Sequence, residues 1–433
     1  MRGKNMLGAI LMFFAVGLIF ISPTFSSPTI NFVPPTEPNG TTIYRNWTEV
    51  NITIDDPDGN LDTFKFNWNG TNYTFYDDSL VLALNFNNNS AIGENSTYAV
   101  DISEYGNNGT IHGATWTTNG KFGSALDFDG VDDYVNCGND SSLDITDEIT
   151  IEAWVKIDAW VNNLPRIVAK KDAYSLYFNA TKHEVVMAIY HDNIGKFVEA
   201  NQTLSLNTWY HIAGIYNNST SFKIYINGVE ANLTKDIGTT GTIDSNTNDV
   251  LIGQYEGLNR YFNGTIDEVR IYNRALSEDE IKMHYLSEFQ KYNSTQWRFY
   301  SNVTGLVKSG SYTYYGWAND TGGNSAYTTN YTAESPRILN VNVTPKLSFV
   351  SPTEENGTTI YRSWTEVNIT IDDQDGNLDT FKFNWNGTNY TFMSEAGNSN
   401  PIYSGTYDNL KLGMTFNENG NTATDYSKYG NNG

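Results

Sequence analysis

The sequence predicts an all-β protein, and three observations support this fold class. Tyr, Phe, Thr, Asn and Gly are abundant while charged residues make up only 17% of the chain, a composition typical of short strands joined by polar turns. Apolar and polar residues alternate in many segments, as in EVNITI and EITIEAWVKI. Residues 41–75 recur almost unchanged at 358–392, a spacing far too long for a small solenoid repeat. We therefore expect large β domains, one of which has been duplicated.

The N-terminal segment, 1–27, has the pattern of an export signal. Arg2 and Lys4 precede the uncharged apolar run 6–21, in the order of the charged and apolar regions that direct secretion. The run is slightly short for a membrane-spanning helix, and no small-x-small cleavage site follows it. We expect a signal peptide, with an uncleaved N-terminal anchor as the alternative.

The acidic composition limits the partners of the protein. A formal net charge of −23 disfavours nucleic acid and anionic membrane surfaces, since both attract clustered Lys and Arg. The single cysteine, Cys137, excludes an intramolecular disulfide, so stability must come from apolar cores or from metal. Asn-x-Ser/Thr sequons exceed chance expectation, which favours an extracellular, glycosylated protein at the cell surface; alternatively, such turns simply suit a β-rich chain. Membrane contact would go through the N-terminal segment or an anchor beyond residue 433.

Residues 28–76 predict only half of a sandwich. Val50, Ile52 and Ile54 alternate with polar residues, but an immunoglobulin-like fold needs about seven strands in roughly 100 residues. Residues 289–336 supply the missing strands, with the same alternation. We therefore expect one discontinuous immunoglobulin-like β-sandwich, made of 28–76 and 289–336, that carries residues 78–288 as an inserted domain.

The second copy has the same organisation. After a linker, 337–346, residues 347–392 repeat the first half of the sandwich. LKLGMTF and SKYGNNG, within 408–433, resemble LVLALNF and SEYGNNG at the start of the inserted domain. We therefore expect a truncated second repeat, in which half a sandwich leads into the start of a second inserted domain.

The inserted domain contains clear local signals. In 148–157 the apolar residues alternate with Thr150, Glu152, Trp154 and Lys156, as a strand of a two-sheet sandwich requires. Asn227-Gly228 suits the positive φ angles of a type I′ hairpin. In 276–281, Ser277 precedes Glu280 by three residues and apolar residues flank them, which predicts a capping box and one short helix.

Several segments of 78–288 together carry a resemblance to a known family. They are GKFGSALDFDGVDDYVNCG (120–138), EITIEAWVKI (148–157), WYHIAGIY (209–216), FKIYINGV (222–229) and FNGTIDEVRIYNRALSEDEI (262–281). In this order and spacing they resemble the laminin-G-like jellyroll of the concanavalin A-like lectin/glucanase superfamily. The resemblance implies a two-sheet jellyroll that binds glycans or protein surfaces and holds calcium as its cofactor.

Two aspartates match the acidic positions of the family. Asp129 lies in the DFDG turn and Asp267 in GTIDEV, and hard oxygen donors in tight turns suit Ca²⁺. The alternative for each is a turn-capping carboxylate. Strict alternation would place Asp267 on the same face as Val269 and Ile271, where an unpaired carboxylate is costly. We therefore expect either a bulge that turns Asp267 outward or a partner such as a metal, an arginine or backbone N–H groups.

The loop 254–262 is the predicted ligand contact. Tyr255, Arg260 and Tyr261 combine aromatic faces with a guanidinium fork, which suits a sugar. Tyr174, Tyr190 and His191 are weaker candidates, and we expect His211 to be a hydrogen-bonded strand residue.

A separate motif, DDPDGNLD (55–62), has the acidic spacing of a calcium loop. Its glycine comes too early for an EF-hand and no bidentate Glu follows, so a hairpin turn is expected and a weak calcium site is the alternative.

Three functions remain open at this point. A surface binding or adhesion protein needs no catalytic residues and fits the resemblance. An architectural envelope protein would use its repeats only for length. A polysaccharide-active enzyme would need paired carboxylates, but the sequence has no Glu-x-Asp-x-x-Glu, no triad motif and no phosphate loop. We therefore expect a binding protein and not an enzyme.

Overall fold

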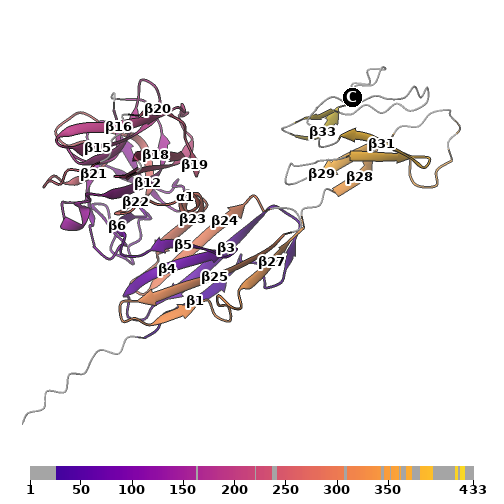
Figure 1. Ribbon diagram of the computed structural model, residues 1–433, viewed down its shortest axis with the longest axis horizontal. Helices are drawn as coiled ribbons and strands as arrows, with labels where there is room; N and C mark the ends of the chain where they lie inside the picture. Colours follow the sequence, from indigo (N-terminus) through magenta and orange to yellow (C-terminus); the bar gives the residue numbers. More distant parts are fainter. Residues whose placement is uncertain are drawn as a thin grey trace, which may run out of the picture.

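The structure is a computed structural model that describes residues 26–161, 164–219, 221–236, 241–306, 310–342, 346–351, 353–359, 361, 367–372, 381–393, 415–417 and 420–424. The prediction of an all-β fold is confirmed, since the described residues form several sheets and one α-helix, α1 (Glu278–Tyr285). Figure 1 shows two neighbouring bodies, one that combines indigo N-terminal strands with orange strands from later in the chain, and one built from the strands between them. Most of the predicted N-terminal signal, residues 1–25, lies outside the described residues.

Two sheets are built from strands that flank the inserted domain, and we call them the host sandwich. The first, in spatial order, contains β1 (Thr29–Val33), β3 (Trp47–Asp55), β24 (Gln296–Thr304) and β23 (Ser287–Lys291). The second contains β2 (Thr42–Ile43), β27 (Arg337–Val341), β25 (Ser311–Asp320), β4 (Leu61–Trp68) and β5 (Thr71–Tyr76), with β26 (Ser325–Tyr327) beside β25.

In both host sheets, strands from before and after the insertion pair directly. β24 runs antiparallel to β3 from Gln296 opposite Asp55 to Thr304 opposite Trp47, and β25 pairs with β4 in the same manner. The alternating apolar residues of these strands meet between the sheets, where Phe299 lies against the rings of Phe66 and Phe75. Neither segment could bury this core without the other. The assignment of these sheets to the immunoglobulin class, and the domain boundaries, stay predictions.

The strands between β5 and β23 form two larger sheets, the jellyroll. The eight-stranded sheet contains β19 (Val229–Glu230), β18 (Ser221–Ile226), β17 (Trp209–Asn217), β12 (Glu148–Ile157), β22 (Asn263–Tyr272), β10 (Ala125–Asp129) and β9 (Thr115–Thr117), with β6 (Leu80–Leu84) on β22. The nine-stranded sheet contains β20 (Leu233–Asp236), β16 (Ile194–Ala200), β15 (Glu184–His191), β14 (Tyr174–Asn179), β13 (Arg166–Lys170), β21 (Val250–Ile252), β11 (Tyr134–Asn136), β8 (Gly109–His112) and β7 (Tyr98–Ala99). A 3₁₀ turn, η1 (Ser141–Leu143), follows β11.

The jellyroll core lies between these sheets. As the alternation predicts, one buried cluster joins residues of the nine-stranded sheet with Ile149, Ile151, Ala153, Val155 and Ile157 of β12. Asn227 and Gly228 adopt φ angles of 53° and 76° between β18 and β19, which matches the predicted hairpin. The capping box at the start of α1 is also confirmed: the Ser277 hydroxyl accepts from the Glu280 N–H, and the Glu280 carboxylate accepts from the Ser277 N–H.

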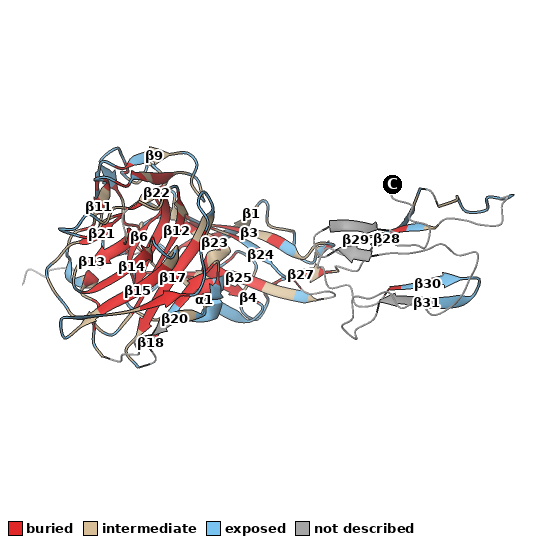
Figure 2. Cartoon of the chain, turned by 90° about the horizontal axis from the view of Figure 1, so that it is seen from above, coloured by how far each residue is buried: buried red, intermediate tan, exposed pale blue. Residues whose placement is uncertain are grey.

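Much of the outer face of the eight-stranded sheet is buried, because it packs against the host sandwich. One apolar cluster contains Phe64 and Phe289 of the host together with Ile215, Tyr272 and Ile281 of the jellyroll. Figure 2 shows the resulting continuous burial around β12, β17 and β22, where they approach β23 and β4. We call this contact the joint. Polar outward residues of β12 such as Glu152 are therefore buried, which alternation alone does not reveal.

The second copy is described only in pieces. β28 (Lys346–Val350) pairs with β29 (Asn368–Asp372), β30 (Phe381–Trp385) with β31 (Thr388–Met393), and β32 (Thr415–Asn417) with β33 (Gly420–Thr424). Much of 347–392 and most of 408–433 lies outside the described residues, so the expected second repeat stays a prediction. Within the described part of the chain, no helix combines the length and apolar character of a membrane span.

Candidate functional site

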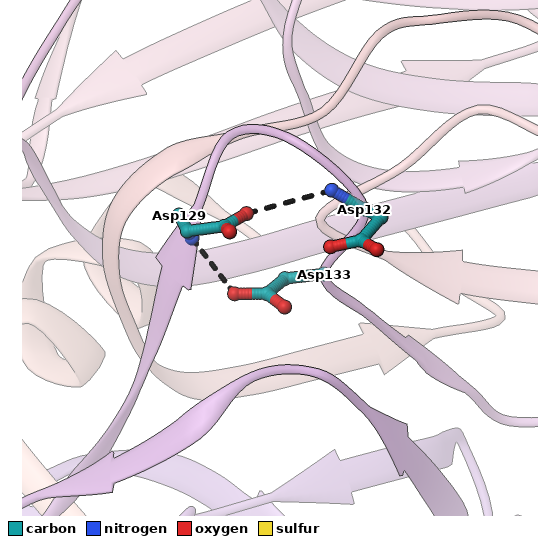
Figure 3. Close-up of side chains that lie close together, drawn as sticks. All are labelled: Asp129, Asp132 and Asp133. Carbon is teal, nitrogen blue, oxygen red and sulfur yellow. Dashed lines mark hydrogen bonds between the residues drawn. The ribbon is translucent and has the colours of Figure 1, made fainter.

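Three aspartates meet in the turn between β10 and β11. Asp129 ends β10, and Asp132 and Asp133 precede β11, so that one carboxylate oxygen from each lies within 4.8 Å of the others. Among the described residues this is the one group in which three such acidic or metal-ligating side chains come so close. Figure 3 shows the three carboxylates gathered around the turn. The sequence pointed to Asp129 alone, although the DGVDD run contained the signal for the other two.

Backbone groups hold the aspartate turn in this shape. Oδ1 of Asp129 accepts the N–H of Val131 at 2.7 Å, and Oδ2 of Asp133 accepts the N–H of Asp129 at 2.8 Å. Gly130 has φ +80°, and a Cβ there would meet Val161 and Asn263. The turn is therefore fixed both by its own hydrogen bonds and by close packing at the glycine.

The charges in this turn do not neutralise one another. Burial raises the pKa of Asp133, and the negative charges of Asp129 and Asp132 raise it further, while the Asp129 N–H lowers it. None of the three carboxylates forms a salt bridge with a described residue. A set of three carboxylates without a cationic side chain fits a hard divalent cation such as Ca²⁺. The aspartate turn could coordinate such an ion with the exposed side chains of Asp129 and Asp132 and with the buried Asp133.

Asp267 lies outside this cluster and has partners of another kind. Its Oδ2 accepts the N–H groups of Lys121 at 2.9 Å and Phe122 at 3.1 Å, and its Oδ1 accepts that of Glu268 at 2.9 Å. Burial, and then the charge of Glu268, raise the pKa of Asp267 well above its usual range, against these three hydrogen bonds.

A β-bulge explains why strict alternation misplaces Asp267. The register of β22 against β12 shifts between Glu152 and Trp154, and Glu268 has φ +50°. Ile266, Val269 and Ile271 face the core, whereas Asp267 pairs with Trp154 at the outer face. The expected outward bulge and the expected backbone partners are therefore both present. A metal at Asp267 stays a prediction.

The predicted ligand loop lies beside β13 and β14. The Arg166 guanidinium lies 3.8 Å from the ring centroid of Tyr177 and 4.8 Å from that of Tyr255. The Arg260 guanidinium lies 5.1 Å from the ring centroid of Tyr255. Tyr177 belongs to an apolar patch on the outer face of the nine-stranded sheet, with Val186, Ala188, Leu164 and Phe197. We call Arg166, Tyr177, Tyr255, Arg260 and Tyr261 the arginine–tyrosine cluster.

Within this cluster the structure corrects the expectation for Tyr255. Its side chain is only 4% exposed, because Arg260 and Arg166 cover its ring and its hydroxyl donates to Oδ1 of Asp172 at 3.0 Å. Tyr255 therefore supports the loop and does not offer an open stacking face. Arg260 and Tyr261 are half-buried at the surface, and Gln254 donates to the Tyr261 hydroxyl at 2.7 Å. Their role as ligand contacts stays a prediction.

Arg166 is the residue in this cluster that the sequence did not single out. Its side chain is almost fully buried, its Nε has no hydrogen-bond partner, and it makes no salt bridge within the described residues. Burial lowers the pKa of Arg166 to about 10, and nearby Arg260 contributes to that decrease. No local sequence signal marks such a residue, since only the register of β13 brings it between the two tyrosine rings.

The weaker candidates divide between core and surface. Tyr174 is buried in the jellyroll core, where its hydroxyl donates to the Leu143 carbonyl, so it is wrong as a contact residue. The Tyr190 hydroxyl lies 3.5 Å from the Tyr255 hydroxyl, at the edge of the arginine–tyrosine cluster. Nδ1 of His191 lies 2.7 Å from the Thr242 carbonyl oxygen. His211 is a buried strand residue, but its Nε2 lies 3.6 Å from Oε2 of Glu152 and its Nδ1 has no hydrogen-bond partner, so the expected side-chain hydrogen bond is not present among the described residues.

An open polar hollow lies on another part of the nine-stranded sheet. It has a volume of about 570 Å³ and is lined by side chains from β7, β8 and β11 and the adjoining turns, including Tyr98, Tyr105, Asn107, His112 and Asp249. None of the predicted site residues lines it.

Comparison with known proteins supports the resemblance within the jellyroll. Residues 129–282 match a family model described as the concanavalin A-like lectin/glucanases superfamily, from the aspartate turn through most of α1. The predicted resemblance is confirmed for this part of the chain. No curated protein sequence matches the chain.

Solved structures show only remote likeness. The binding domain of Paraclostridial Mosquitocidal Protein 1 has 15% identity and a TM-score of 0.39, over 68% of this chain and 75% of that chain. Domain 4 of AbnA, a GH43 extracellular arabinanase from Geobacillus stearothermophilus in complex with arabinotriose, has 20% identity and a TM-score of 0.33, over 47% and 97%. Trypanosoma rangeli sialidase has 17% identity and a TM-score of 0.36, over 50% and 34%. Scores this low carry no argument about activity.

Proposed function

We propose that the jellyroll is a carbohydrate-binding module of an exported cell-surface adhesion protein, and that it contacts its ligand through Arg260 and Tyr261. The observation that carries this proposal is the arginine–tyrosine cluster. Two guanidinium groups lie on aromatic rings, and neither makes a salt bridge with a described residue, although the chain has 49 acidic residues against 26 basic ones. The family match of residues 129–282 adds support for ligand binding.

The chemistry of the cluster favours an acidic glycan. A guanidinium group presents a planar fork of donors that matches a carboxylate or a sulfate, and a half-buried tyrosine offers part of its ring to a sugar. Arg166 would strengthen glycan binding from its buried position, because its charge raises the positive electrostatic potential at Arg260. A surface glycoprotein that displays such glycans would be the partner.

Calcium has a separate place in this proposal. We propose that Asp129, Asp132 and Asp133 hold one Ca²⁺ that fixes the β10–β11 turn, which lies next to Asn263 at the start of β22. Calcium should raise the midpoint of thermal unfolding of the full chain, and the variant Asp132→Asn should reduce that rise. An identical response of this variant and the unaltered protein would contradict the calcium assignment.

Glycan binding is tested by titrating the full chain with neutral and acidic oligosaccharides, alongside two variants. Arg260→Gln should weaken binding of the acidic glycan at least about tenfold, the effect of losing one charge-assisted hydrogen-bond pair. Tyr105→Ala, in the polar hollow, is the matched control and should leave the affinity unchanged. Absence of glycan binding, or loss of binding in Tyr105→Ala but not in Arg260→Gln, would overturn the proposed site.

An architectural protein is the second candidate. The near-identity of 41–75 and 358–392 favours it, since a repeated unit adds length whether or not it binds a ligand. In that case neither glycans nor proteins of the cell surface should bind the jellyroll, and the Arg260→Gln variant should behave like the unaltered chain in every binding assay.

A further inference from the structure

We propose that the host sandwich binds a hard divalent cation, with Ca²⁺ as the expected ion, at the turn between β3 and β4. The ligands would be Asp56 and Asn60 from the segment before the jellyroll and Asp320 from the segment after it. This site is separate from the aspartate turn of the jellyroll and does not depend on glycan binding.

The first observation is a buried carboxylate oxygen without a donor. Asp56 directly follows β3 and is fully buried. Its Oδ1 accepts the N–H of Asp58 at 3.3 Å, but its Oδ2 has no hydrogen-bond partner. A buried carboxylate oxygen that has lost its water and gained no donor is costly, so an oxygen-seeking ion is the partner that such an atom lacks.

The second observation is an unpartnered amide oxygen in the same turn. Asn60 donates its Nδ2 to the Thr321 hydroxyl at 2.7 Å, and its Oδ1 is buried with no donor. With Nδ2 bonded to Thr321, the carbonyl oxygen is the end of this amide that has no donor. Amide and carboxylate oxygens together are the donors that Ca²⁺ takes from proteins.

The third observation is a second buried carboxylate on the strand that pairs beside Asn60, where the N–H of Thr321 donates to the Asn60 carbonyl at 3.0 Å. Asp320 ends β25, opposite Leu61, and is also fully buried. Its two oxygens accept the backbone N–H and the side-chain amide of Asn324 at 2.8 and 2.9 Å. Burial raises the pKa of Asp56, and the negative charges of Asp320 and Asp58 raise it further, although the N–H groups of Asp58 and Asn60 lower it.

No salt bridge within the described residues neutralises these charges. Burial lowers the pKa of Lys291, and the negative charge of Asp56 raises it. Its Nζ lies 4.5 Å from the centroid of the Trp297 ring, and no salt bridge to Asp56 or Asp320 occurs within the described residues. A divalent cation would neutralise both carboxylates and satisfy the orphaned oxygens. It would also link the two segments that the jellyroll separates.

The test compares Ca²⁺ binding by the full chain and by three variants, using titration calorimetry and thermal unfolding in Ca²⁺ and in chelator. Asp56→Asn and Asp320→Asn should each lose one bound Ca²⁺ per chain, or bind it at least about tenfold more weakly than the 0.1–1 mM typical of extracellular calcium modules. The control Asp192→Asn, at a side chain that is 85% exposed and outside both proposed sites, should retain every bound Ca²⁺ ion.

The metal-free state separates a cation site from a simple turn cap. In chelator, Asp56→Asn should unfold at the same temperature as the unaltered protein or higher, because the amide removes an uncompensated buried charge; in Ca²⁺ it should unfold at a lower temperature. Equal Ca²⁺ stoichiometry and affinity in Asp56→Asn, or an equal loss of stability with and without Ca²⁺, would overturn the proposal. If Asp56→Asn fails to fold, the test rests on Asp320→Asn, and retention of the ion by that variant would overturn the proposal.

Discussion

Nδ1 of His284, in helix α1, lies 2.9 Å from Oε1 of Glu152, in strand β12, and both side chains are fully buried. The other ring nitrogen of His284 lies 3.2 Å from the carbonyl oxygen of Thr74 in the host sandwich. One imidazole therefore connects the jellyroll sheet, its closing helix and the host. Burial alone would raise the pKa of Glu152, but His284 and His211 hold it well below its usual range.

Replacing this histidine should destabilise the whole protein. His284→Ala leaves the buried Glu152 with Arg270 at 3.4 Å and His211 at 3.6 Å, so the free energy of unfolding should fall by about 3–5 kcal/mol. Urea unfolding measures the change. His191→Ala, which removes a half-buried histidine at the end of β15, should cost no more than about 1.5 kcal/mol. Equal losses in the two variants would mean that the Glu152 contact contributes nothing to the joint.

A second prediction concerns the pH dependence of stability. Burial raises the pKa of Glu288 from its usual 4.5 to about 7, although Arg298 and Arg270 lower it. The folded protein thus holds a proton that the unfolded chain releases between these values, so this group makes stability fall as pH rises from 4.5 to 7.

Glu288→Gln should remove this contribution. The variant should gain roughly 1–3 kcal/mol relative to the unaltered protein at pH 8 and little at pH 4. Thermal unfolding across that pH range measures the effect, with the exposed Glu278→Gln as control. A gain that is the same at both pH values would show that Glu288 does not titrate in this range.

The third prediction tests how tightly the aspartate turn is packed. Gly113 has φ +77°, and a Cβ there would lie 1.9 Å from Oδ1 of Asp133; Gly138 has φ +71° and open space around it. Gly113→Ala and Gly138→Ala therefore carry the same backbone strain, but only the first displaces Asp133.

The difference between the two alanine variants isolates that displacement. Gly113→Ala should be less stable than Gly138→Ala by about 1–3 kcal/mol, and it should bind Ca²⁺ more weakly if Asp133 is a ligand. Chemical denaturation and Ca²⁺ titration provide the two readouts. Indistinguishable variants would show that Asp133 moves aside at no cost.

The fourth prediction concerns the shared core of the host sandwich. The ring of Phe299 lies 4.8 Å from that of Phe66 and 4.7 Å from that of Phe75, which come from the other side of the insertion. Phe299→Ala should lower the free energy of unfolding by about 3–5 kcal/mol, whereas Tyr292→Ala, at an exposed position, should stay near the unaltered value. Differential scanning calorimetry on the full chain distinguishes these outcomes.

The sequence predicted those features whose causes are local. The strand 148–157, the hairpin at Asn227-Gly228 and the capping box at Ser277 depend on alternation, φ preference and a side chain three residues away, and each is present. The family resemblance also came from consecutive residues, and the match over 129–282 confirms it.

Features that depend on distant packing were beyond such reasoning. Glu152 alternates outward as expected, yet the joint buries it beside His284. The bulge at Glu268 breaks the alternation that would have placed Asp267 in the core. Tyr255 is an aromatic residue suited to stacking, but the guanidinium groups of Arg166 in β13 and of Arg260 in the loop after β21 cover its ring.

The jellyroll leaves the host sandwich at β5 and returns to it at β23, and Asn85 near the exit donates to the Phe289 carbonyl near the return. Tension applied between β1 and β27 would therefore pass along the paired strands of the host, since β3–β24 and β4–β25 span the insertion point. The jellyroll would lie outside this path of tension, so the arginine–tyrosine cluster would keep its shape while the host strands resist stretching.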